Sequence, residues 1–434
     1  MKRRSLWTAL LAIALAAVVV LGLAACGEEN KLPEKKDPVS KYTAKGEWTE
    51  IADKLSWEDI NAFPIKSSDM SIEEARQLCV DFFRYTKTAC WIPDDNFSYF
   101  HMAKHQEENN YTLNQIGGQV YGGLPYIFVS SGNIYRLMDF MDEETGVVDI
   151  SEMTINPHLY GNQCSIGAYW GWARVINSAK YDWTQNMVVS NGFIRVGDYT
   201  YPDYINTLSD TYRTTHILEE NGREKMYECY ALLKAGDGIV YYTTAGHVVM
   251  ISQDAEVIRD AEGKIDPTQS YVLVIDQTPT WATATNEAGD TYSYECNVDA
   301  KWTFQKLFDG NYMPFTYAEW LGTDPIEDTE ITFSHTGDTI TVDQLYNSKV
   351  TSNYGLADIY AMIYDAAGNE VFKTVSRATE AGVMEIKFLK TPGSTYTWGN
   401  LEDLDPKQEY TLKVVAQVGT GERPTLWEGK FIQE

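Results

Sequence analysis

The chain has 434 residues, of which 44% are hydrophobic and 22% are charged, so it is long and apolar enough to form two or three folded domains. Its 62 acidic residues outnumber its 35 basic residues and give a formal net charge of −27. A general nucleic-acid binder needs a basic surface to displace counterions from phosphates, and this composition argues against that class.

The first 26 residues have the pattern of an export leader. Basic residues at positions 2–4 precede an almost unbroken apolar run from Leu6 to Leu23. The run Leu23-Ala24-Ala25-Cys26 that follows resembles the bacterial lipobox. The resemblance implies that residues 1–25 are removed as a signal peptide and that the Cys26 thiol is acylated, which leaves 434 − 25 = 409 residues. A single transmembrane anchor with an incidental cysteine is the alternative.

We therefore expect an extracytoplasmic protein that is held on the membrane of a bacterial envelope by lipid at Cys26. Several acyl chains hold a protein on a bilayer far more firmly than one chain can. Residues 26–47 are polar and lack apolar periodicity, which predicts a flexible tether after the lipidated cysteine. No second apolar run is long enough to span a membrane.

Residues 48–326 are predicted to form an α+β domain. Apolar spacing predicts a helix over 71–88 that begins with a capping box of Ser71 and Glu74. Asn191-Gly192 predicts a two-residue hairpin turn between strands at 187–190 and 193–196. A second helix is expected over 219–233. The β-branched and aromatic runs that follow predict strands at 238–242, 248–252 and 271–275.

Residues 327–434 carry only signals for short strands and turns. About seven strands at this spacing are typical of an all-β sandwich. The stretch from Leu404 to Ala416 resembles the late strand of a fibronectin type III domain, a sandwich of the immunoglobulin-like class. That resemblance implies a corner hydrogen bond from Tyr410 and a role in spacing or binding. The strands are expected at 330–333, 339–342, 357–364, 370–375, 384–389, 409–418 and 427–432.

The cysteine count does not fit a complete disulfide framework. The chain has six cysteines, and five remain once Cys26 is acylated, which is an odd number. Cys79 fits the buried face of the first predicted helix, where a free thiol behaves as a small apolar group. A bridge between Cys79 and Cys90 remains open.

Cys164 and His247 are the candidate reactive residues. The sequence around Cys164 begins with turn residues and continues into a helical pattern, and the start of a helix stabilises a thiolate. His247 follows a glycine at the start of a predicted strand, and the next strand ends in Asp276 and Gln277. A thiolate, an imidazole base and a polar group that orients the imidazole are what nucleophilic acyl transfer requires.

The segment from about Ser71 to Asp276 resembles the NlpC-type and CHAP cell-wall cysteine peptidases and amidases, which have a papain-like core. Gln163-Cys164 is similar to the residues that begin the CHAP helix. Val120-Tyr-Gly-Gly123 is similar to an aromatic-Gly-Gly motif upstream of the NlpC nucleophile. Gly236-Asp237 and Gly246-His247-Val248 are similar to motifs of both families. The chain reads Gln-Cys-Ser-Ile where NlpC-type enzymes usually read Asp-Cys-Ser-Gly. Gln119 also replaces a tyrosine, so their specificity for a free peptide amine is not implied.

The resemblance implies a role for each candidate. Cys164 would be the nucleophile, His247 the general base and Asp276 the residue that orients the imidazole, with Gln277 as its rival. Gln163, together with the main-chain amide of Cys164, is the candidate for stabilising an oxyanion.

The sequence thus predicts a lipid-anchored cysteine hydrolase that cleaves peptide or amide bonds in peptidoglycan. A surface-binding lipoprotein that uses the same scaffold without catalysis is one alternative. Another papain-like acyl transferase, such as a transglutaminase, is the other. His101 and His105 could share a metal on one helix face, but a solvated pair is favoured, and no metal or cofactor is expected.

Overall fold

The computed structural model describes residues 54–94, 117–127, 132–149, 161–179, 181–187, 192–205, 212–285, 291–389 and 395–433. Cys26, the predicted tether and the pair His101 and His105 lie outside the described residues. Within these ranges, none of the helices combines the length and the apolar character that a membrane crossing needs.

The first long helix forms where the sequence predicts it. α3 (Ile72–Thr88) follows the short helix α2 (Trp57–Ala62). Its capping box is complete, because the Ser71 hydroxyl accepts from the Glu74 amide and the Glu74 carboxylate accepts from the Ser71 amide. Cys79 lies on the buried face of α3, as expected.

A nine-stranded mixed sheet organises the part of the chain before residue 327. The strands lie in the order β3-β1-β2-β8-β7-β6-β5-β9-β4, and β5 to β8 form an antiparallel meander. The three strands predicted from the sequence are confirmed as β5, β6 and β7. The bounds are β1 (Cys90–Pro93), β2 (Tyr121–Gly122), β3 (Val147–Val148), β4 (Ile194–Arg195), β5 (Gly238–Tyr242), β6 (Gly246–Glu256), β7 (Tyr271–Thr285), β8 (Thr291–Thr303) and β9 (Met313–Thr316).

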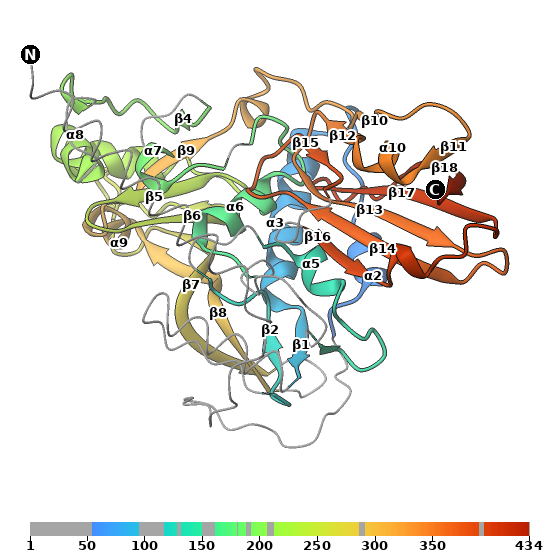
Figure 1. Ribbon diagram of the computed structural model, residues 1–434. Helices are drawn as coiled ribbons and strands as arrows, with labels where there is room; N and C mark the ends of the chain where they lie inside the picture. Colours follow the sequence, from blue (N-terminus) through green and yellow to red (C-terminus); the bar gives the residue numbers. More distant parts are fainter. Residues whose placement is uncertain are drawn as a thin grey trace, which may run out of the picture. The chain divides into compact units, whose positions relative to one another are not determined.

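Two helices pack closely on this sheet and on each other. α6 (Cys164–Trp172) lies beside α3 in Figure 1. A Cβ atom on Gly171 would lie 2.8 Å from the Met250 side chain on β6 and 2.9 Å from the Phe83 ring on α3. Glycine at this position therefore permits the close approach of the three elements. The other described helices before residue 327 are α5 (Ile134–Met138), α7 (Thr184–Met187), α8 (Arg213–Tyr230), α9 (Phe304–Asp309) and the 3₁₀ helix η3 (Glu319–Leu321).

Two sequence predictions in this region are wrong in part. Met187 ends the helix α7 instead of beginning a strand, and β4 pairs with β9; residues 188–191 of the predicted hairpin lie outside the described residues. β9 lies between β5 and β4 in the sheet, and a local hairpin signal cannot reveal so distant a pairing. The second predicted helix begins earlier, at Arg213, and is interrupted at Gly222, where φ is +74°.

The residues after 327 form two sheets around a shared apolar core. All seven predicted strands are present, and β12 and β16 were not predicted. The helix α10 (Val342–Tyr346) corrects the prediction of strands and turns alone. The three-stranded sheet contains β10 (Ile331–Phe333), β12 (Lys349–Ser352) and β15 (Glu385–Lys387), and the six-stranded sheet contains β11 (Thr339–Thr341), β13 (Leu356–Tyr364), β14 (Glu370–Arg377), β16 (Thr395–Trp398), β17 (Tyr410–Val418) and β18 (Thr425–Ile432).

Tyr410 makes the hydrogen bond that its position predicts. Its hydroxyl accepts from the main-chain amide of Asp405 at 2.9 Å, and its ring is buried at the start of β17. The chain order is therefore a mixed α and β region followed by sheets that are compatible with a sandwich.

Buried contacts join the two regions. The guanidinium Nε of Arg136, on α5, lies 3.0 Å from the Asp358 carboxylate on β13, and both side chains are fully buried. The same guanidinium donates to the carbonyl oxygens of Ala357 and Ala378. Gly355 lies against the hydroxyl of Tyr169, a residue of α6. The strands of the second region thus contact the helix that begins with Cys164.

Candidate active site

Cys164 is the first residue of α6. Gln163 precedes it in an extended conformation and makes no side-chain cap. The main-chain amides of Ser165 and Val248 hydrogen-bond to the Cys164 sulfur. Only 6% of the residue is exposed. The thiol therefore lies at the helix end whose free amides favour negative charge, as the sequence predicts.

His247 faces both Cys164 and Asp276. It is the second residue of β6, and its Nε2 atom lies 2.7 Å from Asp276 Oδ2. The ring also hydrogen-bonds to the Cys164 sulfur, for which Nδ1 is the nitrogen that remains. Gly246 permits this placement, because a Cβ atom there would collide with the Thr184 hydroxyl on α7.

Asp276 is held by Asn297, a residue that the sequence reasoning missed. Asn297 lies opposite Asp276 in the β7–β8 register, and its main-chain amide donates to Asp276 Oδ1 at 2.8 Å. Its side-chain amide lies 3.0 Å from each carboxylate oxygen. The carboxylate therefore has a fixed orientation toward His247. Only the strand register could have identified Asn297.

Gln277 does not face His247. Its Nε2 atom donates to the carbonyl oxygens of Leu124 at 2.9 Å and Glu295 at 3.0 Å, and its Oε1 atom accepts from Lys87 Nζ. Of the two polar residues that the sequence left as rivals, the structure brings only Asp276 to the imidazole.

The electrostatics favour an ion pair between Cys164 and His247. Burial alone raises the pKa of the Cys164 thiol, but the charge and hydrogen bond of His247 outweigh it and lower that pKa below its usual value. Burial alone lowers the pKa of His247, whereas Cys164 and Asp276 raise it to about 10. Burial also acts against the Asp276 carboxylate, yet His247 and Asn297 lower its pKa. Cys164, His247 and Asp276 therefore stabilise one another's charged forms: thiolate, imidazolium and carboxylate.

Gln163 lies beside Cys164 in the chain but contacts a residue that was not predicted. Its Nε2 atom is 3.4 Å from the hydroxyl of Tyr181, which also hydrogen-bonds to the side chain of Ser165. Trp183, whose ring centroid is 6.4 Å from that of Tyr181, is 40% exposed. The assignment of Gln163 to the oxyanion stays a prediction.

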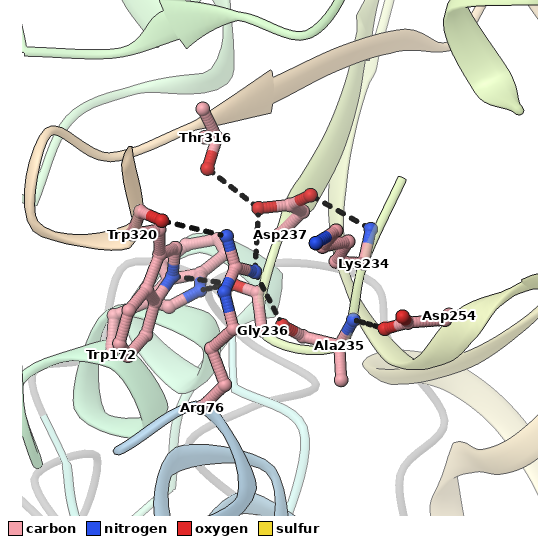
Figure 2. Close-up of polar contacts among 9 residues, drawn as sticks. All are labelled: Arg76, Trp172, Lys234, Ala235, Gly236, Asp237, Asp254, Thr316 and Trp320. Carbon is pink, nitrogen blue, oxygen red and sulfur yellow. Dashed lines mark hydrogen bonds and ion pairs between the residues drawn. The ribbon is translucent and has the colours of Figure 1, made fainter. Parts of the chain in front are cut away.

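Gly236 and Asp237 join several elements through buried polar contacts (Figure 2). Arg76, on α3, lies 2.9 Å from the Asp237 carboxylate, which also accepts from Thr316. Gly236 has a φ of +82°, and its carbonyl oxygen accepts from the indole N–H groups of Trp172 and Trp320. The Gly-Asp turn therefore ties the start of β5 to α3, to the last residue of α6 and to η3.

The glycine step at residues 120–123 packs on the end of α3. Gly123 has a φ of +65°, and a Cβ atom there would lie 2.8 Å from Lys87 Cα. Its amide donates to the Ala89 carbonyl oxygen at 3.0 Å. The step thus fixes the last turn of α3 against β2.

The five described cysteines are all free and buried, so the bridge between Cys79 and Cys90 does not form. The structure brings no group of three His, Cys, Asp or Glu residues together as metal ligands within the described ranges.

Comparison of the sequence with models of known protein families and with curated proteins finds no match.

Proposed function

We propose that the protein is a cysteine hydrolase of peptide or amide bonds, with Cys164 as nucleophile, His247 as general base and acid, and Asp276 as the residue that orients the imidazole. The observation that carries the proposal is the continuous chain of hydrogen bonds from the Cys164 sulfur through His247 to Asp276 and Asn297. Because the thiol heads a helix and faces an imidazolium, it is activated for acyl transfer.

The reaction needs only these groups and water. The Cys164 thiolate attacks the substrate carbonyl carbon, and the oxyanion that forms lies near the amides at the start of α6. The His247 imidazolium gives its proton to the leaving amine as the C–N bond breaks, which leaves a thioester on Cys164. Neutral His247 then takes a proton from water, whose oxygen attacks the thioester and releases a carboxylic acid and the thiolate.

The substrate that we propose is a stem peptide or cross-bridge of peptidoglycan. The support is the run Leu23-Ala24-Ala25-Cys26, which would attach the chain to the outside of a bacterial membrane, together with the motifs around Cys164 and His247. In this proposal residues 48–326 are the papain-like domain and residues 327–434 are a fibronectin type III-like domain. Loss of the three leader cations would change the formal charge from −27 to −30, and a tethered enzyme of that charge would work at short range.

The test is mass spectrometry of purified peptidoglycan after incubation with the chain from residue 27 onward. We expect new fragments from the wild type and none from Cys164→Ala, and the fragment masses will identify the bond that is cut. Cys79→Ala is the matched control, since Cys79 is also a buried free thiol but lies on α3.

Other outcomes would point to the other functions. Incorporation of an added amine into a glutamine peptide, with no release of wall fragments, would identify a transglutaminase. If the wild type releases nothing from several wall types and Cys164 also alkylates slowly, the catalytic proposal fails and a binding lipoprotein is the better description.

A further inference from the structure

Lys87 is a buried cation beneath the candidate active site. It lies in the last turn of α3, and only 1% of the residue is exposed. Its Nζ atom donates to Gln277 Oε1, so the ammonium contacts the residue that follows Asp276 on β7. A Cβ atom on Gly167 would lie 3.1 Å from the same Nζ atom. Since Gly167 lies three residues after Cys164 on α6, Lys87 contacts both elements that carry the site.

The main chain of Lys87 is held as firmly as its ammonium. Gly123 packs on Lys87 Cα, and the Cys296 thiol donates to the Lys87 carbonyl oxygen at 3.6 Å. Gln277 is fixed in turn by its bonds to two carbonyl oxygens. Packing therefore holds the Lys87 ammonium in a fixed position relative to α6 and β7.

The site needs a positive charge at this place. A thiolate, an imidazolium and a carboxylate carry a net charge of −1 in a region that is almost closed to water. Burial of uncompensated charge is strongly unfavourable. After Cys296, the groups that raise the pKa of Lys87 through charge are Asp276 and Cys164, so the ammonium lies within electrostatic reach of both. Lys306 also acts on Asp276, but that residue is exposed and its ammonium lies over the Trp302 ring.

Ionisable groups on three neighbouring elements act on Lys87. Burial lowers the pKa of Lys87 to about 8, while Cys296 on β8, Asp276 on β7 and Cys164 on α6 act in the opposite direction. The lysine is therefore still mostly protonated at pH 7.

We propose that Lys87 is a positioning residue that supplies the buried counter-charge for the Cys164 thiolate and the Asp276 carboxylate. The inference rests on the proposed function, because it assumes that Cys164 reacts as a thiolate. It assigns a chemical task to a lysine that touches neither the reacting atoms nor His247. A neutral side chain at this position would leave the buried site with its net negative charge and shift Cys164 toward the uncharged thiol.

The test is the pH dependence of Cys164 alkylation by iodoacetamide in the full chain, read at the Cys164 peptide by mass spectrometry. Lys87→Gln can still donate a hydrogen bond but carries no charge. We expect it to slow alkylation at pH 7 by at least about threefold, the change that half a pKa unit produces, and to move the acid limb to higher pH. Lys87→Arg keeps the charge and should restore most of the rate.

Lys66→Gln is the matched control. Lys66 is also buried, donates to a carbonyl oxygen and has a pKa lowered to about 8 by burial, but it contacts Glu327 and Tyr354 instead of the site. It should leave the alkylation profile unchanged. A Lys87→Gln variant that melts like the wild type and has the wild-type profile would overturn the proposal.

If Lys87→Gln does not fold, Gln277→Met is the second test. It removes the oxygen that accepts the hydrogen bond from the Lys87 ammonium and should slow alkylation in the same way. An unchanged rate would count against the role of Lys87. If Cys164 of the wild type reacts no faster at pH 7 than a cysteine in a free peptide, the proposed function itself fails. If the wild type is reactive and Lys87→Gln is equally so, only the inference about Lys87 fails.

Discussion

At the scale of single residues, the central feature is that Cys164 and His247 stabilise each other's charged forms. Each would be driven toward its neutral form by burial alone, which raises the pKa of a thiol and lowers that of an imidazole. Their mutual attraction reverses both effects. Asp276 adds to the reversal, because its carboxylate lies 2.7 Å from the imidazole.

This pairing predicts a bell-shaped pH profile for hydrolysis. Activity should rise as pH passes the lowered pKa of the Cys164 thiol, because only the thiolate attacks the carbonyl. It should fall as pH passes about 10, where His247 loses the proton that it gives to the leaving amine. The measurement is kcat/KM for wall fragments between pH 5 and 11.

The variant His247→Ala tests whether the imidazolium lowers the pKa of Cys164. Without the imidazolium, burial should raise the pKa of Cys164, so alkylation of the thiol should move to more alkaline pH. Alkylation at neutral pH that is unaffected by His247→Ala would contradict the ion pair.

At the scale of elements, the pairing of β7 with β8 decides how the site is built. The register places Asn297 opposite Asp276, and irregularities in the β6–β7 and β7–β8 ladders lie next to the carboxylate. Side chains alternate between the two faces of a strand, so a slip of one residue would exchange Asp276 for Gln277. The hydrogen bonds from Asn297 therefore belong to the same strand pairing that selects the carboxylate.

Removal of the Asn297 side chain should weaken catalysis without unfolding the protein. A hydrogen bond to a charged group contributes about 1.5–3 kcal/mol, so Asn297→Ala should lower kcat about 10- to 100-fold and change KM little. Steady-state kinetics on a wall fragment are the measurement. The matched control is Asn369→Ala, since Asn369 also donates to an aspartate, Asp365, but in a turn of the C-terminal region. Equal losses of activity in the two variants would mean that Asn297 has no specific role.

At the scale of the whole described structure, the C-terminal sheets are more than an appended module. Arg136 reaches from α5 to the buried Asp358 on β13, and Gly355 packs on Tyr169 of α6. One apolar core includes residues of both regions, such as Trp172 on α6 and Tyr360 on β13. The helix that begins at Cys164 is therefore packed among residues of both regions.

Loss of either Arg136 or Asp358 alone should destabilise the protein more than loss of both together. Arg136→Met leaves the buried Asp358 carboxylate without the Arg136 guanidinium, and loss of one partner of a buried pair typically costs about 3–5 kcal/mol. The double variant Arg136→Met/Asp358→Leu should recover much of that loss. Urea denaturation measures both.

The control for the buried pair of Arg136 and Asp358 is an exposed ion pair. Arg259→Met breaks the exposed pair with Glu228 and should change stability little. If the effects of Arg136→Met and Asp358→Leu simply add, the two side chains are not coupled as the structure implies.

Local features of the chain can be predicted from the sequence without knowledge of the fold. The capping box of Ser71 and Glu74, the three central strands, the cysteine at the head of a helix and the Tyr410 corner are each set by a few neighbouring residues. Their signals are periodicity, turn chemistry and spacing, which need no knowledge of distant partners. The pairing of β4 with β9 has no such local signal, because the two strands are more than a hundred residues apart.

By itself, therefore, the sequence determined the long helix α3, the three central strands and most strands of the C-terminal region, and it singled out Cys164 and His247. Only the tertiary structure decided that Asp276 and not Gln277 meets the imidazole, that Asn297 holds the carboxylate, and that Lys87 lies beneath both. The reason is physical: these choices depend on strand register and on which face each side chain takes, and long-range packing sets both.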